Sequence, residues 1–421
     1  MGGVPCRAPA GGLPLPTLAL VPMLRGWSFM SENVGSYPAI STSTNVCEEF
    51  AYSVFDYELP GFGVQHSDRC NQPNFIEYCP DCHHTDLHSY HCNRWDCPVC
   101  YPWTANKRAR ESADRLYGVM RAWQATGADI GFFNHVVMSP PASAYEDFDE
   151  KKAAKDVRKY CKEIGLSGGA LIFHPYRIDE EIEMIFHDLR VSGELKVNNW
   201  IAVHQNILKG SFISGREIRS WRDYVYFSPH WHIVGFFKLK ERSNVFYERT
   251  GWTYKNVSWE KYHEALDKAG ARRTIAYLCT HHRYQKGKQS LTYFGKAAPN
   301  QVSRTTTIDF KVSKCPVCSV DIKQMDLDGN VVADLSRGDL YRLPVHSAKD
   351  AEHLIDNIKL GRFQFDPKNY NKCWYPVVHR FYTVRTDFSR HVKPVEVVTV
   401  ERDTMLEPCL RPWATEEEIQ A

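Results

Sequence analysis

Runs of apolar residues predict four buried strands in the middle of the chain, at residues 130–138, 170–174, 224–238 and 290–294. Turn-forming residues bound the first two runs. Pro175 is expected to close the second strand, and Ser228-Pro229 is expected to kink the third.

Helical periodicity appears between these strands. Apolar residues recur at helical spacing over residues 104–124, whose polar face is basic, and further helices are expected at about residues 147–164 and 259–282. Strand, helix, strand, strand, helix, strand is the order of an α+β fold with an antiparallel or mixed sheet.

The two ends of the chain lack this regularity. Residues 1–65 are rich in Gly, Pro and Ser and are expected to form a poorly ordered leader. Their apolar stretch, Leu13 to Leu24, contains prolines and is too short to span a bilayer, so a leader is favoured over a signal peptide. We expect a cytoplasmic protein with a zinc-binding module and basic helix at residues 66–124, a main domain at 125–300 and a C-terminal region at 301–421.

Composition adds one constraint. The 421 residues are 43% hydrophobic and 24% charged, which is ordinary for a globular protein, and the formal net charge is only +2. A global basic field is therefore excluded, and any nucleic acid must be held by local patches.

The cysteines indicate metal. Clustered Cys-x-x-Cys pairs, in a chain without a convincing secretion signal, are typical of zinc ligands rather than disulfides. Cys79-x-x-Cys82 and Cys97-x-x-Cys100 are expected to supply the two close pairs of a tetrahedral structural site. Spare ligands nearby leave a second zinc ion or a different pairing open: Cys70, His83, His84, His91 and Cys92.

A further pair, Cys315 and Cys318, forms half of a zinc site. Its partners are not evident from the sequence, although Cys279 and Cys373 are available.

His230-Trp231-His232 lies inside the longest apolar run. Because side chains alternate along a strand, both imidazoles are expected on one face, about 6–7 Å apart, where they can reach a single divalent ion. Two structural histidines in a half-buried strand are the alternative, since a lone His-x-His is a weak motif.

The predicted helix downstream carries Tyr277. Arg273 and His281 are four residues before and after it and share its face. A free phenol has a pKa near 10, and a cationic neighbour would favour the reactive phenolate. Basic residues predict a DNA-binding surface here: Arg272, Arg273, Arg283, Lys286 and Lys288. The alternative is that Tyr277 is a packed helix aromatic.

The order of these motifs resembles that of rolling-circle replication initiators, above all those of archaeal plasmids and viruses. The resemblance covers about residues 75–320, and the motifs that carry it are HVVMSPP from His135, HPY from His174, His230-Trp231-His232, Tyr277-Leu278-Cys279-Thr280-His281 and CNRWDCPVC from Cys92.

The resemblance implies an HUH endonuclease, with an antiparallel sheet carrying His230 and His232 as ligands of Mg²⁺ or Mn²⁺. It implies that Tyr277 attacks a phosphate of single-stranded or origin DNA, keeps the 5′ end as a phosphotyrosine and later rejoins the strand. A third ligand is usual in the family, and His135 and His174 are the candidates.

The chain departs from the family at the tyrosine motif. Many relatives have Tyr-x-x-Lys, but position 280 is Thr. Tyr284 and Tyr293 are therefore alternative nucleophiles, although the helix around Tyr277 favours that residue.

Three other functions stay open: a relaxase, a single-strand transposase of the same superfamily, and a zinc-stabilised nucleic-acid-binding protein without catalysis. The chain has no phosphate-binding loop of an ATPase, so unwinding is expected to come from a host helicase and synthesis from a host polymerase.

Overall fold

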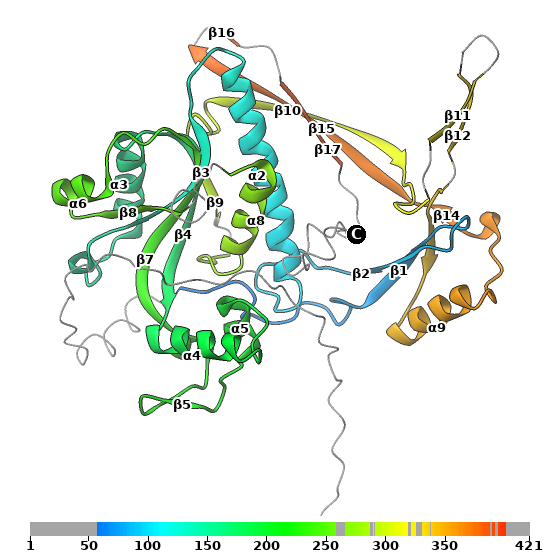
Figure 1. Cartoon of the computed structure of the whole chain (residues 1–421), viewed down its shortest axis with the longest axis horizontal. Helices are drawn as coiled ribbons and strands as arrows, with labels where there is room; N and C mark the ends of the chain where they lie inside the picture. The colour runs from blue at the N-terminus through cyan, green and yellow to red at the C-terminus, as the bar shows by residue number, and fades with distance from the viewer. Residues whose placement is uncertain are drawn as a thin grey trace, which may run out of the picture.

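The computed structural model describes residues 57–257, 266–286, 289, 291–318, 321–325, 331–336, 338–387, 390–391 and 395–400. Its centre is a five-stranded sheet in which every pairing is antiparallel. The strand order is β8 (Thr253–Asn256), β3 (Phe132–Ser139), β7 (Val225–Phe237), β4 (Leu166–Ile178) and β9 (Leu291–Gly295) (Figure 1). The predicted α+β class with an antiparallel sheet is confirmed.

Helices cover both faces of this sheet, which explains why its central strands are apolar almost throughout. One face packs against α2 (Tyr101–Gln124) and α8 (Lys268–Leu278), as Figure 1 shows. The other face lies against α3 (Glu150–Glu163) and α6 (Ser243–Thr250), with the short helix η1 (Ala142–Ala144) in the preceding loop.

The strand β4 is longer than the predicted residues 170–174, whereas β7 agrees with its predicted range of 224–238 to within one residue at each end. Pro175 does not close β4; the strand continues to Ile178, with a register shift between His174 and Tyr176 opposite Pro229 of β7. The two prolines coincide with this irregularity, where the ladder needs fewer donors. The kink expected at Ser228-Pro229 is therefore confirmed as a bulge.

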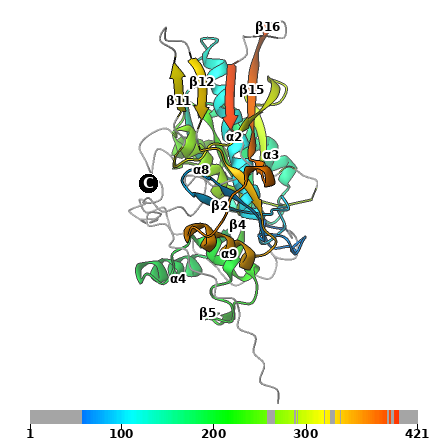
Figure 2. The ribbon, with the colours of Figure 1, turned by 90° about the vertical axis from the view of Figure 1, so that its right-hand side faces the viewer.

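Beyond the bulge, smaller elements close one end of the sheet. They are α4 (Glu180–Val191), α5 (Asn199–Gln205), the hairpin of β5 (Phe212–Ile213) and β6 (Arg216–Glu217), and η2 (Trp221–Tyr224). Figures 1 and 2 both place α4 and β5 at the end of the molecule opposite β16 (Arg390–His391).

A second, four-stranded sheet joins distant parts of the chain. Its order is β14 (Asn371–Lys372), β13 (Tyr341–Pro344), β1 (Pro73–Tyr78) and β2 (Thr85–Ser89), and α9 (Ala348–Lys359) packs on β1. The predicted module at residues 66–124 is thus completed by residues from the C-terminal region.

A long ribbon connects the module to the main domain (Figure 1). β10 (Val302–Val312) pairs along its whole length with β15 (Trp374–Asp387), which also pairs with β16 (Arg390–His391) and β17 (Val395–Val400). The hairpin of β11 (Asp321–Met325) and β12 (Val331–Ser336) and the short helix η3 (Pro367–Asn369) complete the described elements.

Two expectations about segment ends need correction. The predicted leader includes residues 57–65, yet Leu59 is fully buried and Tyr57 and Phe62 pack against the core; residues 1–56 lie outside the described residues. The helix expected at 259–282 is described from Lys268, capped by the Asp267 side chain, and residues 258–265 lie outside the described range.

None of the described helices combines the length and apolar character that a membrane span requires.

Candidate metal centre

Three histidines from the two central strands come together on the face covered by α2 and α8. His174 of β4 is the register partner of His230 in β7, and His232 follows two residues later on the same face. One ring nitrogen of each lies within 4.8 Å of the others, so the triad could hold a metal ion. The strand alternation predicted for His230 and His232 is borne out, and of the two candidates for a third ligand it is His174 that joins them.

The hydrogen bonds of the triad leave nitrogen lone pairs free to bind. Nδ1 of His230 lies 2.7 Å from the Ser228 carbonyl oxygen, to which it donates, so Nε2 carries the lone pair. Both ring nitrogens of His174 are buried and lack a hydrogen-bond partner in the described part of the chain. A buried imidazole without partners is costly, and coordination to a cation would remove that cost.

His135 of β3, the other candidate ligand, contacts the triad from outside. Its Nε2 lies 2.8 Å from Nδ1 of His232, and its side chain is 8% exposed. If His232 binds a metal through Nε2, Nδ1 carries the proton and donates to His135. His135 is then an orienting residue rather than a ligand.

The triad is held in the neutral form that binds metals. Burial lowers the pKa of His230 to about 3, with Arg177 as the second cause, and burial also lowers the pKa of His135 to about 4. Burial, followed by the surrounding histidines, holds the pKa values of His174 and His232 well below their usual range. Neutral imidazole is the ligand form, so no proton must leave before a metal binds near pH 7.

Tyr277 is placed near this centre by α8. Its ring contacts His281 at 4.8 Å between centroids, and the His281 ring lies 4.3 Å from that of His174. The predicted proximity of Tyr277 and His281 is thus present, although α8 ends at Leu278 and His281 lies just beyond it.

The cationic residue near Tyr277 is Arg190 rather than the predicted Arg273. Arg273 is exposed on α8, and the nearby charges are Glu183 and Arg190 of α4. Burial, then Glu183, raises the pKa of the Tyr277 phenol, while Arg190 lowers it. In the metal-free protein the phenol is therefore protonated at neutral pH.

The two alternative tyrosines lie in different surroundings. Tyr293 of β9 is packed against α2, where its hydroxyl donates to Ser112 Oγ at 3.1 Å and Arg115 lies 4.4 Å above its ring. Tyr284 is half-buried and forms a β-bridge with Glu58. Of the three, Tyr277 is the one whose ring reaches the triad through a single intervening side chain.

Several residues around the centre escaped the sequence analysis. Trp200 of α5 stacks on His281 at 4.4 Å and 13°. His204, also of α5, lies between Phe62 and Tyr101, with ring distances of 4.2 and 4.4 Å. Their spacing along the chain carries no motif, because tertiary packing brings α5 to the end of α8.

Eight of the eleven described cysteines form two groups of four, each with its sulfur atoms within 4.8 Å of one another. One group contains Cys70, Cys92, Cys97 and Cys100; the other contains Cys79, Cys82, Cys315 and Cys318. All eight are free thiols, and their closest described sulfur contacts, 3.3 to 3.9 Å, are far longer than the roughly 2.05 Å of a disulfide. Either group could hold a metal ion.

The grouping corrects the expected pairing. Cys79-x-x-Cys82 and Cys97-x-x-Cys100 do not share one site, because each pair takes its partners elsewhere. The half-site at Cys315 and Cys318 is completed by Cys79 and Cys82, while Cys373 packs beside that group and Cys279 is buried at the C-terminal end of α8. Cys70, considered only as a spare ligand, belongs to the first group.

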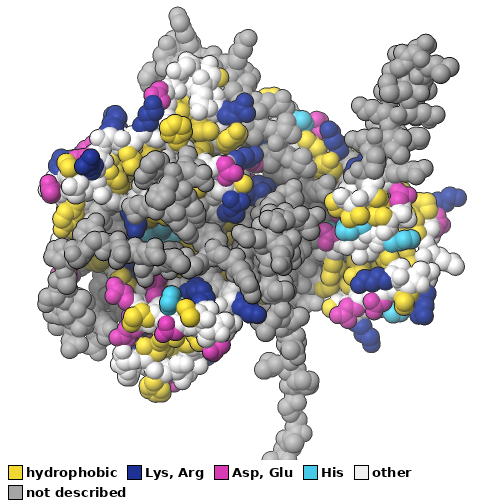
Figure 3. Space-filling model, viewed as in Figure 1, with side chains coloured by type: hydrophobic (Ala, Val, Ile, Leu, Met, Phe, Trp, Pro, Cys, Tyr) yellow, Lys and Arg dark blue, Asp and Glu magenta, His cyan; other side chains and the backbone are white. Residues whose placement is uncertain are grey.

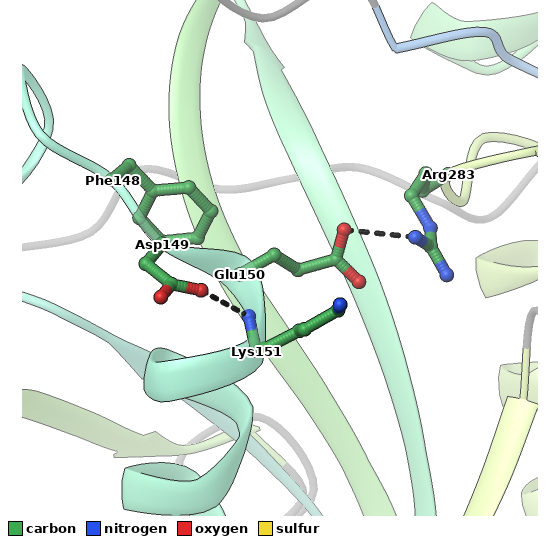
Figure 4. A pocket seen from close by; sticks show the side chains of 5 residues that line it. All are labelled: Phe148, Asp149, Glu150, Lys151 and Arg283. Atoms are coloured by element: carbon green, nitrogen blue, oxygen red, sulfur yellow. Dashed lines mark hydrogen bonds and ion pairs between the residues drawn. The ribbon is translucent and has the colours of Figure 1, made fainter.

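The predicted basic residues do not form one surface. Arg272 is half-buried, whereas Arg273 and Lys286 are exposed, and Lys288 lies outside the described residues. Arg283 is 9% exposed and pairs with Glu150 at 2.8 Å. It lines a cavity of about 610 Å³ beside Phe148, Asp149 and Lys151, in which Figure 4 shows the Glu150 carboxylate pointing to the guanidinium. Arg283 thus has a structural ion pair.

The visible surface agrees with the near-neutral charge. On the face in Figure 3, Lys and Arg side chains are scattered and interspersed with Asp and Glu. Comparison of the chain with family models, curated proteins and solved structures found no match.

Proposed function

We propose that this protein is a metal-dependent endonuclease that nicks one strand of DNA and holds the new 5′ end on Tyr277, as a rolling-circle replication initiator does. One observation carries the proposal: three neutral imidazoles, of which those of His174 and His230 are buried and that of His232 is half-buried, converge on the sheet face beneath the helix that presents Tyr277. The order of motifs in the sequence points to the same chemistry.

His174, His230 and His232 would hold the catalytic ion. Because the three ligands are all nitrogens, Mn²⁺ fits better than Mg²⁺, which prefers oxygen ligands. When bound, such an ion would polarise a phosphate oxygen and stabilise the charge that develops in the transition state.

Tyr277 supplies the nucleophile. Its phenol loses a proton to solvent, its oxygen forms a bond to phosphorus, and the bond from phosphorus to the 3′ oxygen breaks. The 3′ oxygen takes up a proton and leaves as a hydroxyl that can prime synthesis by a host polymerase. The reverse transfer rejoins the strand, so the phosphotyrosine conserves the energy of the broken diester.

The two cysteine groups would hold structural Zn²⁺. Four thiolates at the usual zinc–sulfur distance of about 2.3 Å place their sulfurs about 3.8 Å apart in a tetrahedron. The contacts between Cys70 and Cys97, at 3.9 Å, and between Cys82 and Cys315, at 3.5 Å, are close to that value. The second ion would tie the β1–β2 hairpin to the C-terminal region.

The test is cleavage of labelled single-stranded oligonucleotides that tile the cognate replicon, with Mn²⁺, Mg²⁺ or EDTA. We expect a nick that requires the metal and is lost in the His230→Ala/His232→Ala double variant and in Tyr277→Phe. Tyr284→Phe and His204→Phe serve as matched controls and should cleave like the wild type.

Cleavage that persists in EDTA or in the double histidine variant would contradict the metal mechanism. A folded, zinc-loaded protein that binds these oligonucleotides but cleaves none would favour the non-catalytic binding protein instead. Removal of activity in Tyr284→Phe but not in Tyr277→Phe would move the nucleophile.

A further inference from the structure

The sheet face that carries the histidine triad continues past the bulge. There, Tyr176 and Ile178 of β4 and their register partners Phe227 and Val225 of β7 belong to the core on the opposite face. Arg177 lies between Tyr176 and Ile178 and is exposed, so it points to the face of the triad. Its register partner, Tyr226, lies on that same face and is 39% exposed.

The Arg177 side chain crosses the sheet next to the triad. Its Nη2 donates to Ser139 Oγ of β3 at 3.3 Å, and β7 lies between β3 and β4. The guanidinium therefore spans β7 close to His230. Its charge also acts on His230, whose pKa is lowered first by burial and next by Arg177.

Arg177 has donors available for a ligand. Within the described residues, its hydrogen bond goes to a neutral hydroxyl, which uses one of five N–H groups. Arg249 forms ion pairs with Glu163 and Glu241, whereas Arg177 forms no ion pair in the described residues, although the Glu183 carboxylate of α4 lies within electrostatic range of it. A cation held by a serine beside a metal group suits an anionic ligand that bridges the two.

A guanidinium beside an exposed aromatic ring recognises a particular chemistry. Arginine binds phosphate oxygens in a bidentate manner, and a tyrosine ring offers a platform on which an unpaired base can stack. A base in a duplex is already stacked and paired, so the combination of the two side chains selects a single strand.

We propose that Arg177 and Tyr226 form a subsite for single-stranded DNA next to the scissile phosphate. Arg177 binds a phosphate that flanks or includes the cleaved position, and Tyr226 stacks on the adjoining base. This inference rests on the proposed function, because it takes the neighbouring metal centre to be the site of DNA cleavage. Binding to the subsite can nevertheless be measured without cleavage.

The experiment measures binding of fluorescent single-stranded oligonucleotides to the full, zinc-loaded chain without added Mn²⁺ or Mg²⁺, over a range of salt concentrations. The variants are Arg177→Gln, Arg177→Lys and Tyr226→Leu. The control is Arg242→Gln, an exposed arginine just before α6, on the other side of the sheet. Thermal unfolding verifies that each variant is folded.

We expect Arg177→Gln to weaken binding roughly tenfold and to reduce the slope of log affinity against log salt by about 0.7, the loss of one phosphate contact. Arg177→Lys should retain the slope but lose part of the affinity, because lysine cannot bind a phosphate in a bidentate manner. Tyr226→Leu should weaken binding at least fivefold with the slope unchanged.

Affinity and salt slope equal to wild type in Arg177→Gln would overturn the inference, whether or not the protein nicks DNA. If Tyr226→Leu weakens binding of duplex and single strand equally, the stacking role is wrong. If the salt slope falls as expected but no metal supports cleavage, the subsite stands and the proposed nicking activity fails.

Discussion

His135 offers a sharp test of the metal centre because it contacts a ligand without being one. His135→Phe keeps a ring of similar volume and removes the 2.8 Å contact between His135 Nε2 and His232 Nδ1. Loss of such an orienting partner typically lowers metal affinity about 10- to 100-fold, or about 1.4 to 2.8 kcal/mol of binding free energy. We expect Mn²⁺ affinity to fall within that range.

His204→Phe is the matched control. His204 is half-buried, and desolvation likewise lowers its pKa to about 4. Its ring stacks between Phe62 and Tyr101 rather than on the triad, and its Nε2 donates to the Thr280 carbonyl oxygen at 3.3 Å. Phenylalanine preserves that stacking, so Mn²⁺ affinity should stay within about twofold of wild type, well inside the 10-fold effect expected of an orienting partner.

Calorimetric titration with Mn²⁺, starting from protein whose cysteine groups hold zinc and whose histidine triad is empty, measures both effects. The reasoning is refuted if His135→Phe binds Mn²⁺ as tightly as wild type, or if His204→Phe loses as much affinity as His135→Phe. Thermal unfolding of the zinc-loaded protein without added Mn²⁺ separates a lost ligand geometry from a loss of fold.

Three further predictions concern the zinc sites, the pH dependence and the sheet. Cys92→Ser and Cys315→Ser should each lower the zinc content measured by native mass spectrometry from two ions to one, since the two groups share no ligand; loss of both ions in either variant would contradict this. The pKa of His204, about 4, is below the unfolded value of 6.5, so the unfolded chain binds the proton first. The unfolding free energy of metal-free protein should therefore fall as pH drops from 6.5 to 4, and His204→Phe should flatten that slope by up to about 1.4 kcal/mol per pH unit in chemical denaturation. Gly235→Ala would place a Cβ 2.3 Å from the Gly168 carbonyl oxygen. Denaturant unfolding should therefore show a free energy of unfolding lower by about 1–3 kcal/mol. An unchanged free energy of unfolding would mean that β4 and β7 can move apart at this position.

Local patterns of the sequence were sufficient for the chemistry-bearing strands. The apolar run around His230 and His232 predicts β7, and strand alternation alone puts both imidazoles on one face. Helical spacing likewise predicts that Tyr277 and His281 approach each other.

Features that depend on contacts between residues distant in the sequence could not be predicted from local patterns. The partners of Cys315 and Cys318 lie more than 200 residues away in the sequence; Cys82 and Cys315 are separated by 233 residues. No local spacing of cysteines predicts such a pairing. Arg177 was missed because Pro175 was expected to close β4, whereas the strand passes through a bulge and continues.

The leader shows the same limitation. Residues 57–65 have the composition of a loop, yet tertiary packing buries Leu59 and pairs Glu58 with Tyr284. The composition of a segment predicts whether that segment would be ordered in isolation. Here residues of the main domain pack against the segment and hold it in place.

The most direct test of the proposed activity is to identify the residue that carries the DNA. After reaction with a cognate single strand and Mn²⁺, the protein is digested with trypsin and nuclease, and the peptide with a retained nucleotide is sequenced by mass spectrometry. The three tyrosines fall on separate tryptic peptides, residues 274–283, 284–286 and 289–296. The account predicts a nucleotide on the first, at Tyr277. A nucleotide on either other peptide would contradict that assignment, and no adduct from metal-loaded protein that binds the strand would contradict the proposed activity itself.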